Sequence, residues 1–397
     1  MKHIREWLDL PVIEIDHSQC LNNKSTRKTC EKCVLVCPVT ALKMNDKELS
    51  LKESLCIDCT ACVSACPNLT IDYAPKPYTK TINEITAYPG ADITCNQFAK
   101  YQKGIKIPCY LSLDLPMLLH YYRTLARYNK KKGIESDDKL VLELYIGSCE
   151  QCKYKEHLDI YKHIDTIENW CEELKIPITI KLTKEADKFT DKQSPAVSGI
   201  SRRSLFKSLG FSRDTDSSKD NANEQADKKK DKKDKKIEAD FLSYKQKNDY
   251  KRRLVEKGLK LIRRKGIHSD NKLMPASHFA LINKTEACKK CDVCMRICPT
   301  EALEWIDGED LATLYFYPQK CIACGRCQIC PEGSISLKTL DTNTYHNQDS
   351  ITLIELAIKK CDDCGEAFKA ESDNLDQRVC KLCELKDEKK RALFDSL

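Results

Sequence analysis

Several features common in proteins are scarce or absent in this chain of 397 residues. It has only 12 glycines and 14 prolines, which excludes collagen-like and Gly/Pro-rich low-complexity sequences. It contains no run of 18 apolar residues, so we expect no transmembrane helix. The first residues, MKHIREWLDLPVIEID, mix charged with apolar side chains. We therefore expect no secretory signal and a cytoplasmic protein.

Cysteine is abundant by contrast, with 25 copies. Most of them stand in groups separated by two or three residues. Disulfides are rare in the reducing cytosol, where grouped thiols instead indicate metal binding.

Basic charge is concentrated in two segments. The chain carries 67 Lys and Arg against 60 Asp and Glu, a net charge of +7. Residues 227–236 contribute +4 and residues 243–266 contribute +8, so everything else sums to −5. A uniformly basic surface for nucleic acid is therefore not expected.

A short motif recurs four times, in two pairs near the two ends of the chain. Each copy is a cysteine, a proline, three further residues and an aliphatic residue. The four copies begin at Cys37, Cys66, Cys298 and Cys330. An internal repeat of this kind predicts repeated structural modules.

The first pair contains Cys56-x2-Cys59-x2-Cys62-x3-Cys66-Pro67, the cluster-binding run of bacterial ferredoxins. The upstream run, Cys20-x9-Cys30-x2-Cys33-x3-Cys37-Pro38, has an enlarged first gap. In two-cluster ferredoxins the cysteine before proline binds the other cluster. The predicted [4Fe-4S] ligand sets are Cys20, Cys30, Cys33 and Cys66, and Cys56, Cys59, Cys62 and Cys37. The alternative is eight structural or zinc-binding cysteines.

The second pair is similar except for one shortened gap. Its first run is Cys288-x2-Cys291-x2-Cys294-x3-Cys298-Pro299, and its second ends with only two residues between Cys327 and Cys330. The missing residue changes the turn that presents Cys330. The predicted sets are Cys288, Cys291, Cys294 and Cys330, and Cys321, Cys324, Cys327 and Cys298.

Both pairs resemble the two-[4Fe-4S] bacterial ferredoxin family, over about residues 14–75 and 278–340. This resemblance implies two compact β-α-β-β-α-β-like modules that transfer single electrons. The enlarged gap after Cys20 is similar to ferredoxin-type subunits of larger oxidoreductases.

Between the pairs, the apolar pattern predicts a small α/β domain. Residues 104–109, 139–146 and 178–182 are expected as strands, Asp114 as the N-cap of one helix, and about 155–175 as a second helix. Alternating strands and helices predict a parallel sheet. The carboxyl ends of parallel strands share one edge, so four thiols could meet there. They are Cys95, Cys109, Cys149 and Cys152.

Two stretches of this region, GIKIPCYLSLDLPMLL and LELYIGSCEQCKY, resemble the delta-subunit family of methyl-viologen-reducing hydrogenases. The resemblance implies a [2Fe-2S] cluster and electron transfer between a hydrogenase or formate dehydrogenase and a disulfide-reducing partner. This chain lacks the early CxxC of that family and has a tighter Cys149-x2-Cys152 pair. The alternative is a fold without a cluster. The apolar stripe of the second predicted helix consists of Ile160, Ile164, Ile167, Cys171 and Leu174. Cys171 is therefore expected in the core.

Near the C-terminus, Cys361-x2-Cys364-x15-Cys380-x2-Cys383 matches the four-thiolate zinc template. The segment resembles a zinc ribbon, with one structural Zn²⁺. A rubredoxin-type iron site is the alternative.

The predicted fold class is α+β and multi-domain: two dicluster ferredoxin-like modules, a small central α/β parallel-sheet domain and a zinc-ribbon-like segment. We expect modules at 1–80, 81–186, 268–345 and 346–397, a disordered charged linker at 187–240 and a basic helix at 241–267. Residues 201–207 resemble a twin-arginine export motif but lack the apolar segment that should follow.

These features predict an iron–sulfur electron-transfer protein that serves a larger redox enzyme. That enzyme would be a formate dehydrogenase, a hydrogenase or another molybdopterin or flavin oxidoreductase. No nucleophile triad, phosphate loop or dinucleotide motif accompanies the cysteines, so no substrate-converting site is expected. The alternative is a redox-sensing nucleic-acid-binding protein that uses the basic segments and the zinc ribbon. A third option is peripheral contact of the basic helix with a membrane.

Overall fold

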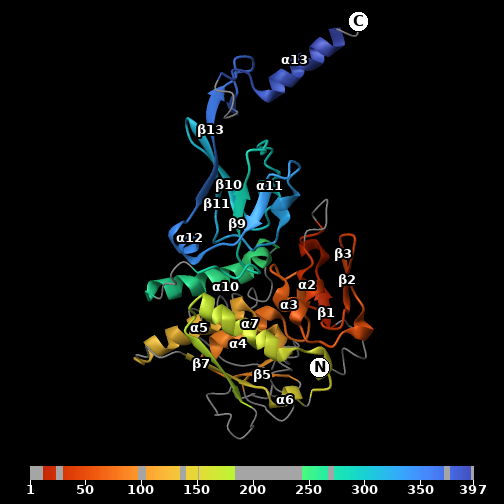
Figure 1. Ribbon diagram of the computed structural model, residues 1–397, viewed down its shortest axis with the longest axis vertical. Helices are drawn as coiled ribbons and strands as arrows, with labels where there is room; N and C mark the ends of the chain where they lie inside the picture. Colours follow the sequence, from red (N-terminus) through yellow and green to blue (C-terminus); the bar gives the residue numbers. More distant parts are fainter. Residues whose placement is uncertain are drawn as a thin grey trace, which may run out of the picture. The chain divides into compact units, whose positions relative to one another are not determined.

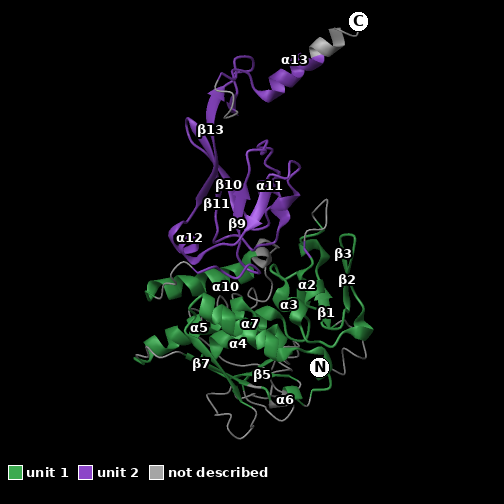
Figure 2. Cartoon of the chain, in the orientation of Figure 1, with its two compact units in different colours: residues 1–23, 31–268 green, residues 24–30, 269–397 purple. Residues whose placement is uncertain are grey.

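The computed structural model describes residues 12–23, 30–96, 104–134, 140–150, 152–183, 244–266, 272–370 and 376–394. It divides into two compact units, residues 1–23 with 31–268 and residues 24–30 with 269–397 (Figure 2). The predicted linker and the twin-arginine-like motif lie outside the described residues.

The first unit begins with a ferredoxin-like region (Figure 1). Strand β1 (Ile13–Ile15) pairs antiparallel with β4 (Ile71–Tyr73). Between them, β2 (Leu42–Asn45) and β3 (Glu48–Leu51) form a hairpin. Two short helices, α2 (Lys32–Leu35) and α3 (Ala61–Ala65), carry cluster-motif cysteines.

A four-stranded parallel sheet follows, as the sequence predicts. Its order is β6 (Ile105–Ile107), β5 (Ile93–Cys95), β7 (Leu140–Tyr145) and β8 (Ile178–Thr183). All three pairings are parallel. Strand β5 and the preceding helix α4 (Tyr78–Ala87) were not among the predicted elements.

The two predicted helices cover this sheet. Helix α5 (Leu115–Lys131) begins where expected, because the Asp114 carboxylate accepts the Met117 N–H at 2.9 Å. Helix α7 (Ile160–Glu173) is capped in the same way by Asp159. Its predicted apolar stripe is buried, including Cys171 at 8% exposure.

Helix α10 (Tyr244–Arg264) contains most of the predicted basic helix and packs along α5. Its buried side includes Leu254, Leu259 and Ile262. Gly258 allows the two helices to approach closely, because a Cβ at that position would lie 2.7 Å from Leu119 Cβ. The helix is therefore part of the core of the first unit.

The second unit repeats the pairing of the ferredoxin-like region. Strand β9 (Leu281–Lys284) pairs antiparallel with β12 (Ile335–Lys338), and β10 (Leu303–Asp307) forms a hairpin with β11 (Leu311–Phe316). Helix α11 (Val293–Arg296) lies between β9 and β10 in the chain.

The β10–β11 hairpin of this unit is part of a larger antiparallel sheet. Strand β13 (Ile351–Lys360) pairs with β11, and β14 (Ala367–Lys369) pairs with β13. Helix α12 (Thr342–Asn347) precedes β13, and α13 (Lys381–Phe394) ends the described chain. Because β13 ends at Lys360, it leads directly into the C-terminal cysteine group.

Candidate iron–sulfur and metal sites

Three of the four cysteine loops share an unusual backbone conformation. In the loop after Cys56, Asp58 and Thr60 have left-handed φ angles of 55° and 57°. Alternating left- and right-handed residues turn successive amides toward one side and create a concave anion site, as at many iron–sulfur centres. The same two offsets are left-handed after Cys288 and Cys321. The residues concerned are Lys290, Asp292, Ala323 and Gly325.

The four Cys-Pro motifs also share their geometry. The third residue after each of these cysteines is left-handed, and the residues are Thr40, Leu69, Glu301 and Gly333. In three copies the next amide then donates to the cysteine sulfur, at 3.2–3.3 Å for Cys37, Cys66 and Cys298. In the fourth, Cys330 Sγ lies 3.1 Å from the Ser334 hydroxyl. Donors to sulfur stabilise bound thiolate and tune the reduction potential.

In the first unit, the thiols of one predicted ligand set interact electrostatically. Burial raises the pKa of Cys62, and nearby thiols raise it further: Cys59, Cys56 and Cys37 of its own set, and Cys33 of the other. Burial likewise raises the pKa of Cys59, with a contribution from Cys37. A buried thiol that lies close to other thiols loses its proton readily only when a cation is nearby. The irons of a cluster would supply this positive charge, so these residues fit an iron–sulfur cluster.

In the other set, Cys66 is connected to the segment that contains Cys20 through Asn68. Its carbonyl oxygen lies 3.3 Å from Cys66 Sγ, and its amide donates to the Gln19 carbonyl at 2.5 Å. Cys66 is thereby placed next to the residue that precedes Cys20. The enlarged gap before Cys30 includes residues 24–29, which lie outside the described part.

In the second unit, the largest electrostatic contributions to two half-buried thiols come from their own predicted sets. Burial raises the pKa of Cys294 to about 11, with contributions from Cys288, Cys291 and Cys330. Burial also raises the pKa of Cys327, with contributions from Cys324, Cys321 and Cys298 and then from Cys294 of the other set.

The sequence predicted that the shortened gap before Cys330 changes its turn, and the turn in the structure is tighter. In the first unit α3 is α-helical, and the Cys66 N–H bonds to the Cys62 carbonyl four residues earlier. The equivalent segment here, Arg326–Ile329, is a 3₁₀ helix, and the Cys330 N–H bonds to the Cys327 carbonyl three residues earlier. The segment with one residue fewer is thus a 3₁₀ helix, which is narrower than an α-helix. Cys330 still packs against the same buried core as the other cysteines of this pair.

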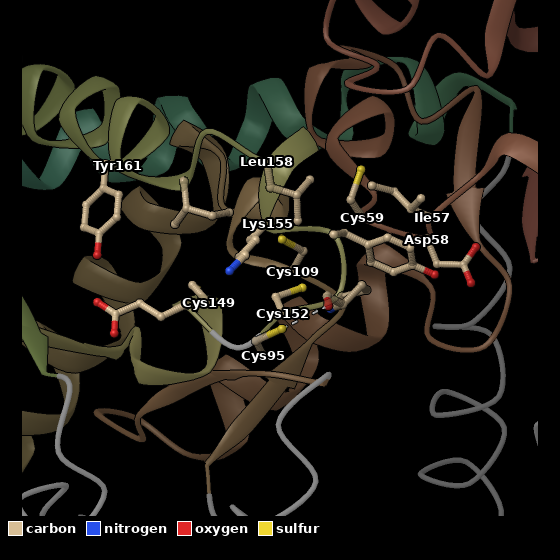
Figure 3. A pocket seen from close by; sticks show the side chains of 14 residues that line it. Ile57, Asp58, Cys59, Cys95, Cys109, Cys149, Cys152, Lys155, Leu158 and Tyr161 are labelled. Atoms are coloured by element: carbon tan, nitrogen blue, oxygen red, sulfur yellow. Dashed lines mark hydrogen bonds between the residues drawn. The ribbon is translucent and has the colours of Figure 1, made fainter.

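The four central thiols lie around one cavity of about 220 Å³. Cys95 ends β5, while Cys109 follows β6 and Cys149 and Cys152 follow β7, as the parallel-sheet argument predicts. Figure 3 shows their side chains converging on the cavity. Burial raises the pKa of Cys109, followed by contributions from Cys95, Cys59 and Cys149.

Cys59 was not expected at this cavity. It belongs to the ferredoxin-like loop, yet it lines the cavity together with Ile57 and Asp58 (Figure 3). No local sequence pattern indicates this contact, since Cys59 and Cys109 belong to different modules of the chain.

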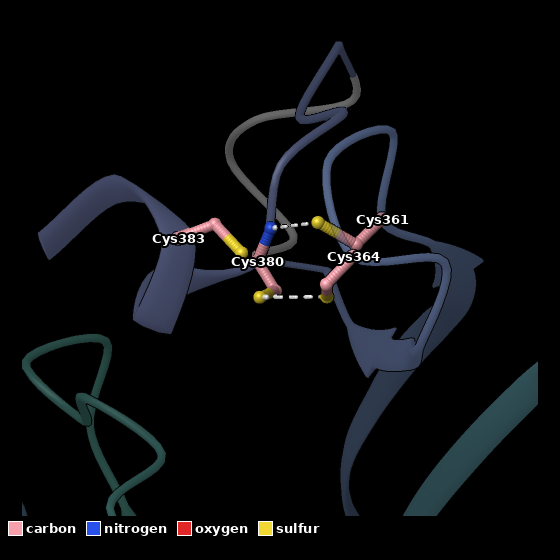
Figure 4. A group of neighbouring side chains, drawn as sticks. All are labelled: Cys361, Cys364, Cys380 and Cys383. Atoms are coloured by element: carbon pink, nitrogen blue, oxygen red, sulfur yellow. Dashed lines mark hydrogen bonds between the residues drawn. The ribbon is translucent and has the colours of Figure 1, made fainter. Parts of the chain in front are cut away.

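The C-terminal cysteines form a compact group. The sulfur atoms of Cys361, Cys364, Cys380 and Cys383 all lie within 4.8 Å of one another (Figure 4). Those of Cys364 and Cys380 are 3.8 Å apart, and a tetrahedral zinc with Zn–S distances of ~2.3 Å has sulfurs ~3.8 Å apart.

Backbone amides stabilise one thiolate of this group even without a metal ion. Hydrogen bonds from the amides of Cys364 and Cys380 lower the pKa of Cys361 to about 6. The Cys380 N–H donates to Cys361 Sγ at 3.2 Å. The group could therefore hold a metal ion.

Comparison with known proteins identifies one domain. Residues 13–67 match the 4Fe-4S dicluster domain family, and no curated protein matches the chain. The chain therefore contains an N-terminal dicluster domain with at least two [4Fe-4S] clusters. Within the described residues, no helix is long and apolar enough to cross a membrane.

Proposed function

We propose that the chain relays single electrons through several iron–sulfur clusters to or from a larger cytoplasmic oxidoreductase, and has no substrate-converting site of its own. The observation that carries this proposal is the position of Cys59. It belongs to a ferredoxin ligand set and also lines the cavity that contains four further thiols. Two redox sites would then lie side by side within one unit.

Four [4Fe-4S] clusters would be held by the four crossed ligand sets. The left-handed loop residues, the N–H donors to sulfur and the electrostatic coupling among thiols support both pairs. Each bound cluster supplies a site that accepts and releases one electron.

A [2Fe-2S] cluster would be held by Cys95, Cys109, Cys149 and Cys152. The resemblance to the hydrogenase delta-subunit family and the cavity between these thiols support this assignment. Contact between the ferredoxin-like region and the central domain is reinforced by the Ser64 hydroxyl, which donates to the Leu111 carbonyl at 3.0 Å.

The partner would be a formate dehydrogenase, a hydrogenase or another molybdopterin or flavin enzyme. The C-terminal cysteines would bind Zn²⁺ as a structural site beyond β13. The alternative function, redox-dependent binding of nucleic acid, gains no support from α10, because part of its basic and apolar surface is buried inside the first unit.

Anaerobic isolation of the full chain with its co-purifying enzyme tests the proposal. We expect reduced chain to transfer electrons to that enzyme, and the transfer rate to fall when Cys66→Ala removes one cluster from the intact complex. An unchanged rate in a variant shown by spectroscopy to lack that cluster would refute the relay. Salt-dependent binding to nucleic acid that changes with cluster oxidation would favour the alternative.

A further inference from the structure

Helix α10 places a buried ammonium group against helix α3. Lys251 is 3% exposed. Its Nζ donates to the carbonyl oxygens of Val63 at 2.7 Å and Ser64 at 2.8 Å. It also lies 2.8 Å from an Asp114 carboxylate oxygen and 4.5 Å from the centre of the Tyr78 ring.

Val63 and Ser64 stand between two cluster ligands. Cys62 precedes them in α3, and Cys66 follows as the C-terminal cap of that helix. Crossed ligation assigns these two cysteines to different clusters. The ammonium of Lys251 therefore lies within about two residues of a ligand of each N-terminal cluster.

We propose that Lys251 is a positioning residue that raises the reduction potential of the N-terminal clusters. This inference rests on the proposed electron-transfer function. A cluster gains one negative charge on reduction, and a nearby positive charge favours the reduced form. The effect is strong where little water screens it.

The paired Asp114 carboxylate offsets only part of this effect at α3. One Asp114 oxygen accepts the Met117 N–H at 2.9 Å and the Tyr78 hydroxyl at 2.7 Å, and the other lies 2.8 Å from the ammonium. Lys251, in contrast, donates directly to two α3 carbonyls. These carbonyls belong to the negative end of the helix, which the ammonium neutralises.

Lys260 provides a matched control on the same helix. Its side chain is 60% exposed and forms an ion pair with Glu256 at 2.6 Å. Removing its charge changes the net charge of the chain by the same amount without altering the contacts of α3.

The test is a potentiometric titration of anaerobic full-length protein, followed by electron paramagnetic resonance. The signals of one N-terminal cluster are assigned by their absence from a Cys62→Ser variant, and those of the other by their absence from a Cys33→Ser variant. In Lys251→Met we expect the equilibrium constant for reduction of at least one of these clusters to fall about tenfold, which is 59 mV for one electron. Lys260→Met should change it less than about twofold, since exposed charges are screened.

A second variant tests the inference if the Lys251→Met protein does not retain its clusters. Asp114→Asn keeps the helix cap but removes the carboxylate, so it should shift the same equilibrium constant upward. Unchanged potentials in iron-loaded Lys251→Met would overturn the inference, as would unchanged potentials in Asp114→Asn. Clusters that are present and reducible in either variant would leave the proposed function intact.

Discussion

Replacing Cys66 by alanine tests crossed ligation in the dicluster domain. Cys66 is 7% exposed, caps α3 and accepts the Thr70 N–H at 3.3 Å. If ligation is crossed, the substitution removes a ligand from the set of Cys20, Cys30 and Cys33. It leaves the set of Cys56, Cys59, Cys62 and Cys37 complete.

The expected loss is one cubane. Four [4Fe-4S] clusters hold about 16 irons, or about 18 with a central [2Fe-2S] cluster, so the variant should lose about four. The buried Thr70 N–H also loses its acceptor, which should cost about 1–3 kcal/mol of folding free energy.

Iron analysis and electron paramagnetic resonance of anaerobically reconstituted protein provide the assay. Crossed ligation predicts that Cys66→Ala and Cys33→Ala lose the same signal, while Cys62→Ala and Cys37→Ala lose the other. The control is Cys171→Ala, which removes a core thiol and should keep all the iron. If Cys66→Ala and Cys62→Ala instead lose the same signal, crossed ligation is wrong.

Three further predictions concern the remaining parts of the structure. Cys383→Ser should remove about one zinc per chain without loss of iron; elemental analysis showing unchanged zinc would rule out this site. Gly258→Val should lower the unfolding free energy by about 1–3 kcal/mol in denaturant titrations, because its Cβ would meet Leu119. A change below about 0.5 kcal/mol would contradict that packing. Burial, with Arg123 nearby, lowers the pKa of His120 to about 4. On acidification, the His120 imidazole is therefore protonated in the unfolded chain before it is protonated in the folded one. The unfolding free energy should fall as the pH drops from about 6.5 toward 4. In His120→Gln, the fall in unfolding free energy over this pH range should be smaller by up to about 3 kcal/mol. An equal fall in the variant and the unsubstituted protein would show that His120 does not cause it.

Local patterns predicted the elements that surround the central cavity. Asp114 caps its helix because a short carboxylate before an apolar helix can bind free amides. The spacing of Ile160, Ile164 and Ile167 predicted the buried face of α7. The parallel order predicted that thiols at the strand ends would share one edge, and they line one cavity.

Contacts between distant segments could not be predicted in this way. Lys251 and Val63 are 188 residues apart, so no local pattern links them. A lysine in a strongly basic segment suggests a solvated side chain, whereas this one is buried by the packing of α10. Cys59 likewise reaches the central cavity only because two modules meet. Strand β5 has three residues, too few for a clear pattern.

Reversible electron uptake by the full chain tests the central claim most directly. Anaerobic, iron-loaded protein is titrated with a low-potential reductant and then reoxidised, with absorbance recorded throughout. The account predicts reversible uptake of about four electrons per chain from four cubanes, or about five with a central cluster. A fully iron-loaded chain that takes up no electron reversibly would contradict it.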